Sequence, residues 1–382
     1  MQDTDSNLGI ASVSMPPASL AAWLRLERTH GIGPRTAAAL LAAFGSVEAI
    51  FDADVGALGA HVSPAQARAL RQPISPDTAR LIDATRRWLD APGRHLLTLG
   101  QPAYPALLAN IHDPPMLLYI NGRMELLSMP ALAIVGSRNA SAQGKANAQA
   151  FAEALSMAGV AIVSGLALGV DAAAHEGALR GPGGTIAVVG TGPDLVYPAR
   201  NRALAARIAQ AGCIVSEYPV GMPPLPSNFP KRNRIISGLA AGVLVVEAAA
   251  QSGSLITARQ AAEQGRDVFA IPGSIHAALS KGCHELIREG AKLVDTAQDV
   301  LEAMQLSPLV FTHAPPAAPA GEGCDDPLLA ALGHDPVEPD ALLARVGGSP
   351  GELSTRLLLL ELDGRIERLP GGLVQRVARD MR

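Results

Sequence analysis

The sequence is poor in several features that would point to particular classes of protein. Its three cysteines, Cys213, Cys283 and Cys324, are far apart and form no C-x-x-C pair, which argues against a zinc site and a disulfide framework and favours a reducing compartment. No apolar run reaches about 18 residues, and residues 1–20 lack a basic segment followed by an apolar one. We therefore expect a cytoplasmic protein with no export signal and no membrane anchor.

Charge and aromatic residues are also scarce. The formal net charge is -4, with 17% charged and 3% aromatic residues. A chain of this charge does not coat nucleic acid non-specifically, so any contact with DNA must come from a local basic patch. The 48% hydrophobic content over 382 residues is enough for a large core divided between two or three domains.

From residue 131 onward, short apolar runs alternate with stretches typical of helices. Each run leads through glycine or another small residue into a helix, a pattern that indicates right-handed βαβ crossovers with helices on both faces of a parallel sheet. The fold class predicted is an extended Rossmann-like α/β core, whose ligands belong at the carboxyl ends of the strands. The predicted strands are 131–135, 160–163, 185–189, 213–215, 243–246, 267–271 and 292–294.

Smaller domains are expected on both sides of this core. Near the start, Gly31-Ile32-Gly33 separates two helical stretches, as in helix-hairpin-helix modules; the turn either approaches a DNA phosphate or belongs to a packing or protein-interaction module. Near the end, a capped Leu-rich helix precedes a hairpin around Pro370-Gly371-Gly372, which predicts a winged helix. That helix has a single cation, Arg356, which argues against groove reading and leaves partner contact as a rival role.

These features divide the chain into five segments. The Pro- and Ala-rich stretch before the last domain has no apolar periodicity and is expected to be a semi-extended linker. We expect a disordered N-terminus (1–18), an N-terminal helical domain (19–95), the Rossmann-like domain (96–305), the linker (306–325) and a winged-helix-like domain (326–382).

Loops of small residues follow three of the predicted strands. Gly136-Ser137-Arg138 brings main-chain N–H groups, a hydroxyl and a guanidinium to a strand end just before a helix, and Ser164-Gly165 and Gly190-Thr191-Gly192 repeat the arrangement. Each loop alone is compatible with a tight turn, but three at one sheet edge predict a phosphate-binding rim. Neither G-x-G-x-x-G nor G-x-x-x-x-G-K-[ST] occurs, so no NAD or ATP cofactor is expected.

The strongest local pattern is the run from Asn228 to Arg234. Lys231, Arg232 and Arg234 could each neutralise a phosphate, Asn233 could bond a base edge or sugar, and Phe229 could stack on an unpaired base. The alternative interpretation is a helix start with solvated charges and a buried phenylalanine.

Two other groups of residues have side chains that occur in chemical sites. Glu247 precedes the hydroxyl-rich helix start at Ser252-Gly253, where a hydrolase could use it as a base, but no positioned His or second carboxylate accompanies it. Ser252 and Gly253 themselves are predicted as DNA contacts at this helix N-terminus. Asp171 and His175 lie at i and i+4 of one helix, where a structural hydrogen bond is expected rather than a metal site, because no third ligand has a fixed spacing. No catalytic and no metal-ligating residues are predicted.

Many motifs in one order resemble the DNA-processing protein A family, DprA, also called Smf. The resemblance covers about residues 101–297. It rests on P-x-L-L, D-P-P and L-Y-x-x-G within 105–122, Ala133 to Arg138, Ser164-Gly165 through Asp171 to His175, Gly190-Thr191-Gly192 with Tyr197-Pro198, Ser216 to Pro219, Asn228 to Ile236, Glu247, Ser252 to Ala258, and Pro272-Gly273-Ser274.

The resemblance implies a homodimer that binds single-stranded DNA, protects it, and loads the recombinase RecA during natural transformation, without catalysis. Its DNA pocket would include Gly136, Ser137 and Arg138 on one side and Lys231, Arg232 and Asn233 on the other. Two alternatives stay open. One is a phosphoribohydrolase-like enzyme using Glu247 and Arg138, although Gln251-Ser252-Gly253-Ser254-Leu255 stands where such enzymes have P-G-G-x-G-T. The other is a recombinase scaffold with secondary affinity for DNA.

Overall fold

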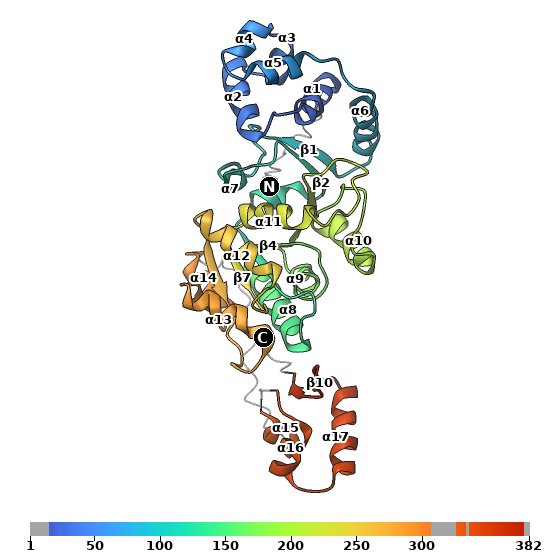
Figure 1. Ribbon diagram of the computed structural model, residues 1–382. Coiled ribbons are helices and arrows are strands. Elements are labelled where there is room, and N and C mark those ends of the chain that lie inside the picture. The colour runs from blue at the N-terminus through green and yellow to red at the C-terminus, as the bar shows by residue number, and fades with distance from the viewer. Residues whose placement is uncertain (1–14, 307–325, 334–335, 378–382) are drawn as a thin grey trace, which may run out of the picture.

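The computed structural model describes residues 15–306, 326–333 and 336–377. Within them a helical part, a large α/β core and a small C-terminal part follow one another, with the first and last at opposite ends of the molecule (Figure 1). Of the segments expected from the sequence, the disordered N-terminus lies outside the described residues except for residues 15–18. The expectation of disorder is wrong for Pro17 and Ala18, which belong to the first helix. The linker lies outside the described residues except for Leu306.

The N-terminal part is built from short helices, most of which start at a proline or a side-chain cap. Ser63 closes a capping box with Gln66, and Ser46, Asp54 and Ser75 each accept a hydrogen bond from the first turn that follows. Its helices are α1 (Pro17–Arg28), α2 (Pro34–Phe44), α3 (Val47–Asp52), α4 (Val55–Gly59), α5 (Pro64–Arg71) and α6 (Pro76–Leu89).

Nine strands of the described chain form one sheet in the order β1-β2-β6-β5-β4-β3-β7-β8-β9. The strands from β3 onward pair in parallel, as predicted. Five of them are buried along their whole length, because helices cover both faces and each buried Val or Ile contributes about 1.5–3 kcal/mol. They are β3 (Ala131–Val135), β4 (Ala161–Ser164), β5 (Thr185–Val188), β6 (Cys213–Ser216), β7 (Gly242–Val245), β8 (Asp267–Ala270) and β9 (Lys292–Leu293).

The sequence analysis did not predict the antiparallel edge of this sheet. Strands β1 (Arg94–Thr98) and β2 (Leu117–Gly122) pair with each other, and β2 pairs with β6. One apolar cluster joins Leu96, Leu117 and Tyr119 of these strands to the N-terminal helices. The added strands therefore attach the helical part to the core. The short helix α7 (Ala106–Ala109) lies between them, and the 3₁₀ helix η1 (Met124–Ser128) follows β2.

The helices of the core form two layers, one on each face of the sheet. One apolar cluster gathers α8, α9 and α14, and another gathers α11, α12 and α13 (Figure 1). Their bounds are α8 (Ala142–Met157), α9 (Val170–Ala178), α10 (Arg202–Ala211), α11 (Asn228–Leu239), α12 (Gly253–Glu263), α13 (Lys281–Arg288) and α14 (Ala297–Ala303), with 3₁₀ helices η2 (Ala199–Asn201) and η3 (Ala278–Ser280).

The C-terminal part has an apolar cluster of its own. The predicted capping box is confirmed, with Ser349 and Glu352 bonding each other's main-chain N–H groups. The predicted hairpin is present as well. The elements are α15 (Pro327–Leu332), α16 (Pro339–Val346), α17 (Pro350–Leu362), β10 (Ile366–Arg368) and β11 (Val374–Arg376).

Candidate nucleic-acid interface

A small cavity lies at the carboxyl edge of the parallel strands, where ligands of such sheets bind. Its volume is about 140 Å³, and its walls come from the loops after β3, β4 and β5 and from the first turn of α11. The residues that line it are Arg138, Gly165, Ala167, Leu168, Tyr197, Pro198, Phe229 and Arg232. Predicted site residues from three separate stretches of sequence therefore meet here.

A buried carboxylate organises the floor of this cavity. Asp171 accepts hydrogen bonds from the main-chain N–H groups of Gly165 (3.1 Å) and Ala167 (3.3 Å). Arg232, only 4% exposed, donates to the Val188 carbonyl at 2.8 Å. Burial lowers the pKa of Arg232 to about 10 and the charge of Asp171 opposes that fall, so the guanidinium stays charged at neutral pH.

Two glycines allow these loops to touch. A Cβ atom at Gly165 would lie 1.9 Å from Nη1 of Arg232, so any side chain there would displace the guanidinium. Gly169 has φ +79° and would bring a Cβ atom to 2.2 Å from the Ser137 carbonyl oxygen. The loops after β3 and β4 are therefore in direct contact, which places Arg138 beside the cavity.

His175 makes the structural hydrogen bonds that the sequence analysis expected. Its Nε2 accepts from the Leu166 N–H at 3.3 Å, so Nδ1 carries the proton and donates to Thr185 Oγ1 at 2.7 Å. Burial lowers the pKa of His175 to about 3. Among the residues that the structure describes, no group of three or more His, Cys, Asp or Glu side chains is arranged to hold a metal ion.

Acid is expected to destabilise the wild-type protein more steeply than a His175→Gln variant. The unfolded chain takes up a proton near pH 6.5 and the folded chain only near pH 3, so this group's stabilisation falls by about 1.4 kcal/mol per pH unit as pH drops through that window. Denaturant unfolding of both proteins between pH 7 and pH 4 measures the difference. If the free energy of unfolding fell equally with pH in wild type and in His175→Gln, His175 would not be buried in its neutral form.

The expectation that the loops present bare N–H groups is wrong at Ser137, Gly165 and Gly192. Ser137 N–H bonds the Glu247 carbonyl, Leu166 N–H bonds His175, and Gly192 N–H bonds the Met222 carbonyl. The Ser164 hydroxyl donates to the Ile134 carbonyl. Buried donors find internal partners wherever they can, so the cations and rings at the cavity, rather than the loop amides, are left to meet a ligand.

The residues of the predicted basic cluster have different environments, although they lie within one turn of α11. Lys231 is exposed, Arg232 is buried against Gly165, and Asn233 is half-buried. Arg234 is held by Glu217 at 2.5 Å and Asp113 at 3.3 Å. Its charge is therefore compensated inside the protein, which argues against a phosphate contact at Arg234, and the two ion pairs hold α11 to Glu217 and Asp113.

Two aromatic rings form one wall of the cavity. Phe229 and Tyr197 have ring centroids 5.4 Å apart, and the guanidinium carbon of Arg138 lies 6.0 Å from the Phe229 centroid. Tyr197 is 49% exposed. The sequence analysis noted Tyr197 only as part of a motif. The sequence feature that could have marked Tyr197 as a site residue is its position before Pro198, shortly after a Gly-rich strand end.

Ser252 and Gly253 begin α12 at the end of the neighbouring strand β7 and do not line the cavity. Glu247 accepts hydrogen bonds from the Ser141 N–H at 2.9 Å and the Ser141 hydroxyl at 2.5 Å, next to the start of α8. Burial raises the pKa of Glu247, and these two hydrogen bonds oppose that rise. The carboxylate thus fixes the first turn of α8 in place.

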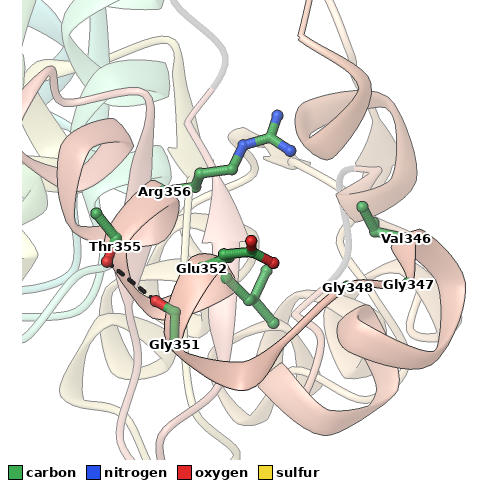
Figure 2. A pocket seen from close by; sticks show the side chains of 8 residues that line it. Val346, Gly347, Gly348, Gly351, Glu352, Thr355 and Arg356 are labelled. Atoms are coloured by element: carbon green, nitrogen blue, oxygen red, sulfur yellow. Dashed lines mark hydrogen bonds between the residues drawn. The ribbon is translucent and has the colours of Figure 1, made fainter.

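A larger groove, of about 640 Å³, lies in the C-terminal part between the ends of α16 and α17 (Figure 2). Glu352 there belongs to the capping box, Thr355 bonds the Gly351 carbonyl, and Arg356 pairs with Asp326 at 2.7 Å. The one cation of α17 is thus already neutralised. This groove lacks the uncompensated positive charge that a DNA backbone requires.

In the N-terminal part, the Gly31 carbonyl accepts a hydrogen bond from Gln66 at 2.7 Å, and Arg35 contacts His112 at 2.7 Å. The Gly-Ile-Gly turn is therefore engaged in packing contacts on its carbonyl side. Within the described residues, no helix is long and apolar enough to cross a membrane.

Comparison with known families gives matches along most of the chain. The family described as DNA recombination-mediator protein A matches residues 95–305. The DprA-like N-terminal HHH domain matches residues 17–54, and the DprA winged helix domain matches residues 312–372. Three separate family descriptions thus follow one another in the order of the three structural parts.

Individual relatives agree with these matches. Protein Smf of Escherichia coli is 43% identical over 77% of this chain and 80% of its own, and the DNA processing protein DprA of Streptococcus pneumoniae is 52% identical over 52% of this chain and 70% of its own.

Two solved structures extend the likeness to the fold. The X-ray structure of DprA from Streptococcus pneumoniae has a TM-score of 0.63 at 39% identity, covering 74% of this chain and 97% of its own. A Helicobacter pylori DNA processing protein A structure, titled for its single-stranded DNA binding mode, has a TM-score of 0.51 at 33% identity, covering 55% of this chain and 96% of its own.

Proposed function

This chain belongs to the DprA/Smf family of DNA recombination-mediator proteins, and from that premise we propose that it binds single-stranded DNA at the cavity between Arg138 and Phe229. The observation that carries the proposal is the pairing of exposed cations with aromatic rings at one sheet edge. Arg138 is exposed and lines the cavity together with Phe229 and Tyr197, and Lys231 is exposed on the same helix as Phe229, two residues further on. Single-stranded DNA is bound by this combination of backbone neutralisation and base stacking.

This arrangement of rings and cations favours binding of single-stranded DNA over binding of duplex DNA. Rings reach only unstacked bases, and a duplex keeps its bases stacked inside. Phe229 and Tyr197 already touch each other, so we propose that a base stacks on the exposed face of Tyr197 while Arg138 and Lys231 hold the adjoining phosphates. Little preference for base identity follows, because every base offers a stacking face.

Removing the exposed ring is expected to weaken binding without unfolding the protein. A Tyr197→Ala variant should lose about 1–3 kcal/mol of binding free energy, or about fivefold to 150-fold in Kd, whereas Tyr197→Phe keeps the ring and should stay near wild type. Fluorescence anisotropy with a labelled oligo(dT) measures the change. Equal losses in both variants would assign the contact to the hydroxyl instead.

We propose a binding role rather than a catalytic one. The carboxylate that a hydrolase would use, Glu247, has both oxygens engaged by Ser141 at the start of α8. The residues around the cavity supply no positioned acid and base pair. The phosphoribohydrolase alternative therefore has no observation in its favour.

Family membership supports three further elements of the proposal. The protein would act in the cytoplasm as a homodimer, protect incoming single strands, and load the recombinase RecA onto them during natural transformation and recombination. The dimer is tested by sedimentation of the purified chain, and loading by RecA filament formation on strands pre-coated with a single-strand-binding protein. A Tyr197→Ala variant should fail at loading in proportion to its lost affinity for DNA; full loading by that variant would favour a scaffold role.

A further inference from the structure

The carboxylate of Glu367 links the C-terminal domain to the core. Glu367, on β10, accepts hydrogen bonds from the first two main-chain N–H groups of α8, those of Ala142 at 2.6 Å and Gln143 at 3.4 Å. Both hydrogen bonds join the C-terminal part to the core. The apolar cluster of the C-terminal domain contains no residue of the core.

This contact uses the chemistry of an anion site. The amides at a helix N-terminus have no partners within the helix, and the helix dipole favours a negative charge there. α8 runs for 16 residues and has no acidic residue of its own in the first turn. Its third amide, that of Gly144, donates to the Ser141 hydroxyl. The first two amides, those of Ala142 and Gln143, donate to the carboxylate of Glu367 from the C-terminal domain.

The Glu367 contact also adjoins the proposed DNA cavity. α8 starts four residues after Arg138, in the same loop. Glu247 connects the loop that carries Arg138 to the start of α8. Its main-chain carbonyl accepts a hydrogen bond from the Ser137 N–H, and its carboxylate accepts hydrogen bonds from Ser141. A backbone phosphate next to the one held by Arg138 would meet the two amides that Glu367 now occupies.

We propose that Glu367 occupies a phosphate site at the start of α8, so that the C-terminal domain and single-stranded DNA compete for it. The inference rests on the proposed function and adds to it a second phosphate position and a docked state of the winged helix. The Glu367 contact is not backed by an apolar cluster shared between the two parts, so a competing anion can displace it. DNA binding would then release the C-terminal domain.

A matched pair of variants in the full-length chain tests the competition. Glu367→Gln removes the charge at the contact, and Glu338→Gln removes the same charge from an exposed position of the same domain. Glu367→Gln should bind oligo(dT) about twofold to tenfold more tightly than wild type, while Glu338→Gln stays within about twofold. Equal affinities of the two variants would overturn the competition.

A distance measurement separates this inference from the proposed function. Spin labels on Met157→Cys in α8 and Leu362→Cys in α17, both exposed positions, report the docking of the C-terminal domain on the core. Cys324 is replaced by serine in the labelled chain, and Cys213 and Cys283 are buried and therefore stay unlabelled. Wild type should give one narrow distance distribution and Glu367→Gln a broad one. Sodium phosphate should broaden the wild-type distribution when sodium chloride of equal ionic strength does not.

The two failures are then distinguishable. If oligo(dT) does not bind but phosphate still releases the domain, the anion site stands and the proposed function falls. If oligo(dT) binds while the label distance stays narrow, the function stands and the competition is overturned.

Discussion

The double variant Arg138→Ala/Lys231→Glu is expected to lose at least about 100-fold in affinity for a single-stranded oligonucleotide. Each exposed cation would make a charge-assisted contact to phosphate, worth about 1.5–3 kcal/mol, and the new carboxylate adds repulsion. The dependence of log Kd on log salt should become shallower by about 1.4, because about 0.7 is lost for each phosphate contact. Fluorescence anisotropy across a salt series measures both quantities.

A control with the same change in charge is available at the opposite edge of the sheet. Arg180, at the end of α9, and Lys292, at the start of β9, pair with surface carboxylates whose loss costs little stability. Arg180→Ala/Lys292→Glu should therefore keep the affinity within a few-fold of wild type and leave the salt dependence almost unchanged. A loss as large as that of the first variant would mean that overall charge, rather than the cavity, governs binding.

Asp171→Ala is expected to destabilise the core by about 3–5 kcal/mol. The substitution leaves the buried guanidinium of Arg232 uncompensated and removes the acceptor for the Gly165 and Ala167 amides. DNA affinity should fall as well, because these groups shape the floor of the cavity. Denaturant unfolding followed by far-UV circular dichroism is the suitable measurement, since both tryptophans, Trp23 and Trp88, lie in the N-terminal part.

A double-mutant cycle tests the cause of that destabilisation. Replacing both members, in Asp171→Ala/Arg232→Met, removes the stranded charge and should recover at least half of the lost stability. Asp83→Ala, at an exposed position of α6, should change stability by no more than about 0.5 kcal/mol. Strictly additive losses in the cycle would show that Asp171 and Arg232 do not interact.

The parallel part of the fold was predictable because its signal is local. Each central strand is a short buried run followed by small residues and a helix, and the predicted run 131–135 coincides with β3. Strands β1 and β2 escaped prediction because Arg94–Thr98 follows a long amphipathic helix directly, and a short half-buried run has no distinctive period. What attaches them to the core is the tertiary pairing of β2 with β6.

The candidate site was predictable in residue type but not in role. The sequence marks Lys231, Arg232 and Arg234 as equivalent cations, yet the helical turn gives them exposed, buried and ion-paired environments. Residues from other parts of the chain decide this difference: Asp171 of α9 lies near the Arg232 guanidinium, and Glu217, just after β6, pairs with Arg234. The Glu367 contact lies 225 residues from its partner and leaves no local pattern.

Photo-crosslinking tests the proposed DNA site most directly. An oligo(dT) carrying a photoreactive thymine analogue, bound to the wild-type chain and irradiated, should attach to Tyr197 or Phe229, and the attachment can be mapped by mass spectrometry after proteolysis. Crosslinks at these rings, lost on competition with unlabelled single strands but not with duplex, are the result expected of the cavity described above. Crosslinks confined to the Gly31–Gly33 turn or to α17 would contradict it and move DNA binding to one of the flanking domains.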